Sequence, residues 1–157
     1  MNRPLFASSN HAVGMFEFDE PYVRIRQGNY RGLDPATFAR DDYTLCIRPD
    51  GLYGVGRAFG EALGVYYAEQ FGLSVVCLRI GPVTRDDNPT RDVRQMATWL
   101  SHCDLAHLVD CCLSAKGVHF EIVYGFPTIR GGSRTSRMSG TCSAIPHETT
   151  RRPIGPG

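Results

Sequence analysis

Tyr53 and Arg57 stand four residues apart, where the sequence pattern indicates the first turn of a helix. Residues four apart lie on one face of a helix, so we expect the phenol and the guanidinium to be neighbours. A nearby cation favours the phenolate form, which turns a tyrosine, with its reference pKa of about 10, into a usable proton acceptor. The pair therefore predicts tyrosine-based acid–base chemistry.

The spacing alone is weak, because Tyr22 and Arg26 repeat it in a segment whose alternation predicts an exposed strand. The usual explanation of such a pair is a solvated cation beside a half-buried ring. The context favours Tyr53, which lies at the start of a crossover helix near the carboxyl end of a parallel strand. Open α/β sheets bind their ligands at that edge.

The elements that must position this pair are a long helix and the strand that follows it. We expect the helix over about 50–71, ended by Gly72, and a doubly buried strand over 74–80. Apolar residues at three- and four-residue spacing predict the buried stripe of the helix. The members of that predicted stripe are Val55, Ala58, Phe59, Ala62, Leu63 and Tyr66.

The remaining elements complete an alternating order of strands and helices. Residues 5–7 read as a strand that enters a polar loop, and Ser101 begins a capping box for a helix to about 115, followed by a strand over 119–124. This order predicts an α/β fold with a parallel sheet. Residues 15–50 read as an irregular insertion, with a short helix after Asp34.

Several further residues have both a functional and a structural interpretation. Ser9 and its neighbours fit either a polar loop or a hydroxyl placed to hold a substrate oxygen. Arg94 fits either a solvated charge or a bidentate clamp for a carboxylate. Gly54, Gly56 and Gly60 are not a phosphate-binding loop, because a turn rather than a strand precedes them, and we expect close helix packing there instead.

Composition narrows the class of protein. The formal net charge is +1, so no overall field favours a nucleic acid or a membrane as partner. No apolar run approaches the roughly 20 residues of a membrane helix, and the first ten residues are not typical of a signal peptide.

The six cysteines show neither C-x-x-C nor zinc-site spacing, which fits a cytoplasmic protein and predicts no metal site. Residues 126–157 read as a disordered tail behind a domain of residues 1–125.

Four motifs in order resemble the extended short-chain dehydrogenases, within the NAD-dependent epimerase/dehydratase family, and most of all its uronate-dehydrogenase-like sugar oxidoreductases. They are FASSNHAVG, YGVGRAFGEALGVYYAEQFGLSVVCLRIGPV, ATWLSHCDLAHLV and FEIVYG. The resemblance covers about residues 4–125 and implies a partial, C-terminal half of a Rossmann-like sheet. It also implies an NAD or NADP cofactor and a small sugar substrate.

The resemblance also implies roles for individual residues. Tyr53 would be the catalytic base, Arg57 would stand where the family has lysine, and Ser9 would be the catalytic serine; Tyr53 and Arg57 would also contact the cofactor. Asn10 and His11 would be neighbours of the substrate, and Arg94 would bind its carboxylate. Gly81, Pro82 and Val83 would lie against the nicotinamide.

The sequence departs from the family in two ways that shape our expectations. The glycine-rich pyrophosphate loop and the ribose-binding acid do not occur, so we expect an N-terminally truncated member. The resemblance also stops after Gly125. A complete site would then need a complementing N-terminal half or a homo-oligomer. The alternatives are a non-catalytic pseudoenzyme fragment, a gene remnant, or a nucleotide-sugar epimerase or dehydratase.

Overall fold

Three segments rich in branched and aromatic residues pair as parallel strands in the computed structural model, which describes residues 3–34, 46–89 and 93–125. They are β1 (Leu5–Ser9), β2 (Val75–Ile80) and β3 (Phe120–Gly125). The sheet order is β1-β2-β3, with Val76 of the central strand opposite Leu5 on one side and Glu121 on the other. The predicted parallel α/β sheet is confirmed.

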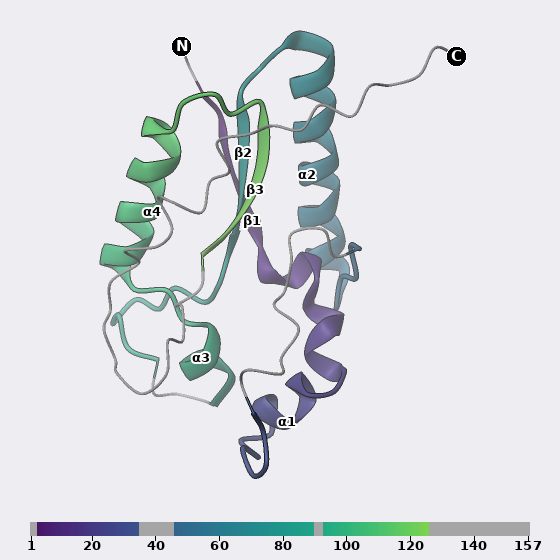
Figure 1. The fold of residues 1–157 in the computed structure, drawn as a ribbon, viewed down its shortest axis with the longest axis vertical. Helices are drawn as coiled ribbons and strands as arrows, with labels where there is room; N and C mark the ends of the chain where they lie inside the picture. The colour runs from purple at the N-terminus through teal and green to yellow at the C-terminus, as the bar shows by residue number, and fades with distance from the viewer. Residues whose placement is uncertain (1–2, 35–45, 90–92, 126–157) are drawn as a thin grey trace.

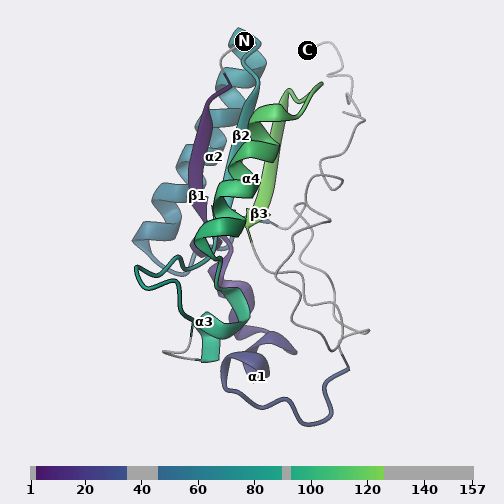
Figure 2. The ribbon, with the colours of Figure 1, turned by 90° about the vertical axis from the view of Figure 1, so that its left-hand side faces the viewer.

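The sheet is covered on both faces, as predicted for a doubly buried central strand. The helix α2 (Leu52–Phe71) packs on one face and α4 (His102–Ser114) on the other (Figures 1 and 2). Alternate residues of β2 serve the two cores: Val76 and Leu78 pack with α4, while Val75 and Cys77 pack with α2. The central strand thus fixes both helices, and α2 is the one that carries Tyr53.

The predicted ends of both helices agree with the structure. Gly72 closes α2 in the left-handed region with φ 65°, and its N–H donates to the carbonyl of Ala68. Ser101 caps α4, because its hydroxyl accepts a hydrogen bond from the backbone N–H of Asp104 at 3.0 Å.

The predicted buried stripe of α2 is wrong, except at Ala58. Phe59 is 68% exposed, and Val55, Ala62, Leu63 and Tyr66 are exposed too. We call the buried side of this helix the inner face; it consists of Gly54, Ala58, Glu61, Gly64 and Ala68. We call the exposed side the outer face; it consists of Leu52, Val55, Phe59, Leu63, Tyr66 and Phe71.

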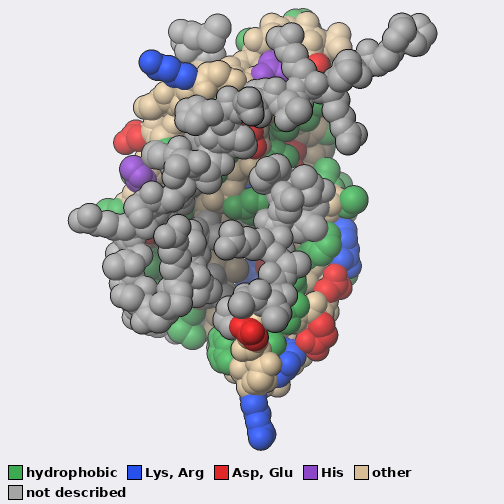
Figure 3. Space-filling view, in the orientation of Figure 1, with side chains coloured by type: hydrophobic (Ala, Val, Ile, Leu, Met, Phe, Trp, Pro, Cys, Tyr) green, Lys and Arg blue, Asp and Glu red, His purple; other side chains and the backbone are tan. Residues whose placement is uncertain are grey.

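The reason for this reversal is the close approach of α2 to the sheet. A Cβ added at Gly60 would lie 2.1 Å from the ring of Phe6, and one at Gly64 would lie 3.2 Å from Cys77 Sγ. The helix can sit this near only because small residues face the strands. Hydrophobic side chains consequently reach the molecular surface along the side formed by α2 (Figure 3).

The connection after β1 is helical where the sequence suggested otherwise. It forms two 3-10 helices, η1 (Asn10–Ala12) and η2 (Gly14–Phe18), and then α1 (Tyr22–Arg26) instead of the predicted exposed strand. No strand of the described residues pairs with Tyr22–Arg26, and its backbone bonds locally, as in Gln27 N–H to Val23 O. The short helix expected after Asp34 and the tail over 126–157 lie outside the described residues.

A further helix, α3 (Val93–Thr98), was not predicted from the sequence. It lies with α1 beyond the carboxyl ends of the strands (Figure 1). Within the described residues, no helix has the length and apolar character required to cross a membrane.

Candidate active site

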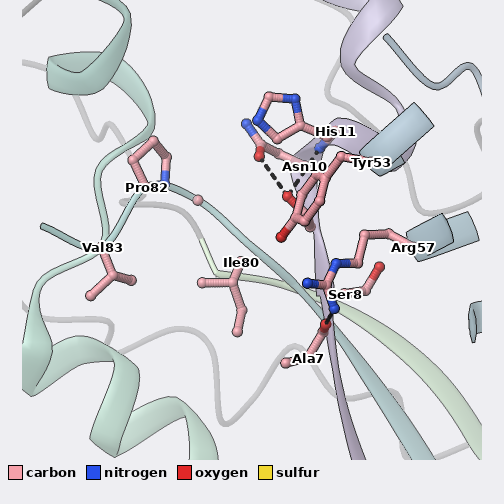
Figure 4. A pocket seen from close by; sticks show the side chains of 11 residues that line it. Ala7, Ser8, Asn10, His11, Tyr53, Arg57, Ile80, Pro82 and Val83 are labelled. Atoms are coloured by element: carbon pink, nitrogen blue, oxygen red, sulfur yellow. Dashed lines mark hydrogen bonds between the residues drawn. The ribbon is translucent and has the colours of Figure 1, made fainter. Parts of the chain in front are cut away.

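A cavity of about 450 Å³ opens at the carboxyl ends of β1 and β2 and at the first turns of α2. In Figure 4, Tyr53 and Arg57 lie together on one side of it, across from Ile80, Pro82 and Val83. The structure therefore brings together every predicted site residue except Arg94. The lining residues are Ala7, Ser8, Ser9, Asn10, His11, Tyr53, Arg57, Ile80, Gly81, Pro82 and Val83.

Ser9 is the last residue of β1, because the strand continues two residues beyond the predicted end. It is only 5% exposed, and its hydroxyl caps η1 by accepting a hydrogen bond from His11 N–H at 3.3 Å. The same hydroxyl donates to Asn10 Oδ1 at 3.1 Å. These contacts hold the hydroxyl at the edge of the cavity.

Tyr53 and Arg57 are neighbours, as the helical spacing predicted. The guanidinium carbon of Arg57 lies 4.6 Å from the centre of the Tyr53 ring, so the cation covers the face of the ring. Arg57 Nη1 also donates to the carbonyl of Ala7 at 2.9 Å. Arg57 thus ties the start of α2 to β1, while Tyr53 stays 56% exposed.

Asp50 is a residue of the site that the sequence analysis missed. Both of its carboxylate oxygens lie near Nδ1 of His11, at 2.9 and 2.7 Å, and the imidazole stands edge-on to Tyr53 with 5.6 Å between ring centres. The two partners are 39 residues apart, so no local spacing could reveal the pair. Its only sequence signal is a carboxylate just before a helix whose second residue is tyrosine.

A buried ion pair lies directly behind the cavity. Glu61 on α2 and Arg79 on β2 are 2% and 1% exposed, and Arg79 donates to both Glu61 oxygens, at 2.9 and 2.7 Å. Ser8 donates to Glu61 and Arg79 donates to the Tyr124 hydroxyl, both at 2.5 Å, so one network joins α2 to all three strands. The signal in the sequence was a charged residue within an otherwise apolar strand.

The electrostatics of this network follow from its burial. Burial alone would lower the pKa of Arg79, but the hydrogen bond to Glu61 and the nearby charges outweigh it, and the pKa is raised. Burial, aided by the charge of Glu61, raises the pKa of Cys77 to about 12. Both groups therefore keep their protons at neutral pH, and the helix stays locked to the sheet.

Arg94, the predicted carboxylate clamp, binds a carboxylate of the chain itself. Its Nε and Nη2 donate to the two oxygens of Glu17 at 2.5 and 2.7 Å, which is the bidentate geometry of an arginine–carboxylate pair. The pair joins α3 to η2, and its members are 24% and 23% exposed. The connections after β1 and β2, which also supply the cavity lining, are tied together at this point.

The glycines of the second motif act through packing, as predicted, at two of their three positions. A Cβ on Gly54 would lie 2.1 Å from the carbonyl oxygen of His11, and Gly60 meets Phe6, whereas Gly56 has nothing within 4 Å. Within the described ranges, no group of three His, Cys, Asp or Glu residues could hold a metal ion.

Comparison with known proteins found no matching family model but clear relatives. The NAD-dependent glucose-6-phosphate dehydrogenase of Haloferax volcanii is 44% identical over 120 residues, covering 76% of this chain and 43% of that protein. The uronate dehydrogenase of Pseudomonas putida is 33% identical over 125 residues, covering 80% and 38%. The chain thus spans about two fifths of the length of these curated relatives.

A solved structure agrees with this result. The crystal structure of uronate dehydrogenase from Agrobacterium tumefaciens superimposes with a TM-score of 0.59 and 32% identity, covering 80% of this chain and 39% of that one.

Proposed function

Because this chain belongs to the family of the uronate and NAD-dependent glucose-6-phosphate dehydrogenases, we propose that it forms the catalytic half of an NAD(P)-dependent sugar oxidoreductase in the cytoplasm. The observation that carries the proposal is one cavity at the carboxyl ends of β1 and β2. Ser9, Tyr53, Arg57 and the segment from Gly81 to Val83 all line it.

Tyr53 is the proposed base and accepts the proton of the sugar hydroxyl that is oxidised. Ser9 hydrogen-bonds the reacting oxygen once its hydroxyl proton turns from Asn10 Oδ1 towards the sugar, and Asn10 and His11 contact the rest of the sugar. Arg57 takes the position of the family's lysine: its guanidinium lies over the Tyr53 ring and holds the base against β1.

The nicotinamide end of the cofactor fits this cavity. Gly81, Pro82 and Val83 form a mostly apolar wall opposite Tyr53. When bound, the nicotinamide supplies the hydride acceptor. The packed glycines of α2 offer no cradle for a pyrophosphate, so we propose that a second polypeptide holds that part, either a complementing N-terminal half or another copy of the chain.

The proposed substrate class is a uronate, with Arg94 as the carboxylate clamp. Glu17 already fills the fork of Arg94, so a uronate would have to displace it. This pairing favours a second candidate, a sugar dehydrogenase for neutral sugars, in which Glu17 neutralises Arg94 permanently.

Calorimetric titration of the chain with NAD and NADP tests the proposal. We expect micromolar binding that survives Tyr53→Phe, together with sugar-dependent reduction of NAD that falls by about 10²–10⁴-fold in that variant because the base is lost. If neither cofactor binds, alone or with a complementing half, the gene-remnant alternative holds. Binding without turnover would make the chain a pseudoenzyme.

A pair of variants separates the two substrate candidates. With uronate as substrate, Arg94→Ala should abolish binding of D-glucuronate and leave NAD binding unchanged. With a neutral substrate, Arg94→Ala should leave D-glucose turnover intact. Glu17→Gln frees the clamp and should raise the affinity for D-glucuronate in either case, which serves as the control that Arg94 reaches the sugar.

A further inference from the structure

His11 and Asp50 form a pair, and the proposed reaction gives Asp50 no task. The imidazole lines the cavity beside Tyr53, and its Nδ1 faces both carboxylate oxygens of Asp50. Within the described residues, Nε2 of the same ring has no hydrogen-bond partner. One nitrogen is thus held by the protein and the other is left for a ligand.

The residues around His11 and Asp50 are closely packed. Asp50 N–H donates to the carbonyl of His11 at 3.3 Å, so the two residues are also joined through their backbones. A Cβ on Gly14 would lie 2.3 Å from Asp50 Oδ2, and a Cβ on Gly54 would lie 2.1 Å from His11 O. Two glycines therefore leave the space that this arrangement requires.

The chemistry of the carboxylate determines where the proton of the imidazole lies. An ionised carboxylate only accepts hydrogen bonds, so Nδ1 must carry the proton. In the neutral ring Nε2 is then a hydrogen-bond acceptor. The neighbouring Asn10 supplies a donor instead: its Oδ1 accepts from Ser9, and its buried Nδ2 has no partner among the residues that the structure describes.

We propose that Asp50 is a positioning residue, which fixes His11 with its proton on Nδ1 so that Nε2 and the Asn10 amide present an acceptor and a donor to the cavity. A hydroxyl group can satisfy both, since it donates one hydrogen bond and accepts others. A carbonyl or carboxylate oxygen cannot donate to Nε2. The pair therefore selects a ligand with a second free hydroxyl besides the one held by Ser9 and Tyr53.

The assignment of Asp50 stands on geometry alone, whereas the identity of the ligand as a sugar rests on the proposed function. Long-range proton–nitrogen NMR spectra of the labelled protein, recorded where the rings are neutral, show which nitrogen of each imidazole is protonated. His11→Gln identifies the resonance. We expect the Nδ1-protonated form in the native chain and a change of roughly tenfold or more in the tautomer ratio in Asp50→Asn.

The matched control is Asp110→Asn, an exposed aspartate on α4, which should leave the His11 spectrum unchanged. A native His11 protonated on Nε2 would overturn the proposal, and so would a tautomer ratio that Asp50→Asn does not alter. The native spectrum decides the first point even if the variant does not fold.

Titration with D-glucose tests the ligand. We expect it to shift the His11 Nε2 resonance in the native chain, with affinity weakened by roughly tenfold in Asp50→Asn, while tetrahydropyran, a ring without hydroxyl groups, has no effect. Equal affinity in both proteins would overturn the role of Asp50 in binding. If the tautomer is as expected but no shift occurs, the sugar function fails, while Asp50 keeps its positioning role.

Discussion

The inner and outer faces of α2 differ in a way that the composition of the helix conceals. The inner face has glycine and alanine around one charged residue and is buried. The outer face has leucine, valine, phenylalanine and tyrosine and is exposed, with Tyr66 and Phe71 in ring contact at the end of the helix. The side chains with the largest apolar area are therefore those that the described residues leave uncovered.

The position of α2 is determined by its close approach to the strands and to η1, and not by the apolar area that it buries. The cavity needs the first turn of α2 to touch the carbonyl of His11 and to reach Ala7 through Arg57. Only small residues permit such a distance, and Glu61 with Arg79 supplies the directional contact that large side chains would otherwise provide. The outer face is free to serve another surface, as expected for a large apolar patch.

The largest effect should come from the charge at the centre of the inner face. Glu61→Leu leaves Arg79 buried without its counter-charge and should lower the free energy of unfolding by about 3–5 kcal/mol, as measured by urea unfolding. Combining it with Arg79→Met should recover most of the loss, because two apolar groups then pack together. On the exposed side, Glu69→Gln should change little. A Glu61→Leu chain as stable as the native one would contradict the comparison.

Adding a methyl group at Gly54 and at Gly56 should have opposite effects on stability, because these glycines lie on different sides of the first turn of α2. Gly54→Ala forces a carbon against the His11 carbonyl and should cost about 1–3 kcal/mol of unfolding free energy. Gly56→Ala enters open space and should stabilise the helix by up to about 1 kcal/mol. Thermal unfolding followed by circular dichroism measures both. Equal effects of the two substitutions would show that α2 does not approach η1 this closely.

Burial of Cys77 beneath the inner face predicts that the free energy of unfolding decreases at alkaline pH. Burial raises the pKa of Cys77 to about 12 from its ordinary value of 9.0, so the folded chain holds this proton more tightly than the unfolded chain. Stability from this group is complete below about pH 9 and is lost as the pH rises towards 12, by at most about 1.4 kcal/mol per pH unit. Urea unfolding of native and Cys77→Val proteins should therefore show a shallower decline for the variant. If the unfolding free energies of the two proteins fell equally with pH, Cys77 would not be the cause of the decline.

The smallest effect on stability is expected on the outer face. Phe59→Ser should change the free energy of unfolding by no more than about 0.5 kcal/mol, because the ring is 68% exposed, and should reduce self-association in light scattering. Its neighbour Ala58 provides the control, since Ala58→Leu on the inner face should cost about 1–3 kcal/mol by overpacking. A large loss in Phe59→Ser would mean that another part of the chain covers the ring.

Local patterns predicted much of the fold. The strand β2 predicted from its mostly apolar run, the cap at Ser101 and the stop at Gly72 were confirmed because neighbouring residues determine them. The family resemblance was confirmed as well, since its motifs lie within single elements. The buried face of α2 was predicted wrongly because periodicity favours the largest apolar side chains, whereas the packing distance demanded the smallest.

The contacts that complete the site were beyond local patterns. The partners in the pairs His11–Asp50 and Glu17–Arg94 are 39 and 77 residues apart, and nothing in either neighbourhood signals the other. Tyr53 and Ser9 were singled out by helix spacing and by position after a strand, and the structure places both at the same cavity. Their catalytic roles stay predictions.

The hydrogen bond from Arg57 to Ala7 covers a backbone group at the edge of the sheet that the described strands form. Pro4 O accepts from β2, so by alternation the carbonyl of Ala7 points away from β2, to the open side of the strand. Such rows of unpaired backbone groups recruit foreign strands, and a charged side chain that covers one of them discourages fibril-like growth. We infer that Arg57 is a gatekeeper as well as a neighbour of the base, so that Arg57→Met should raise thioflavin fluorescence on prolonged incubation.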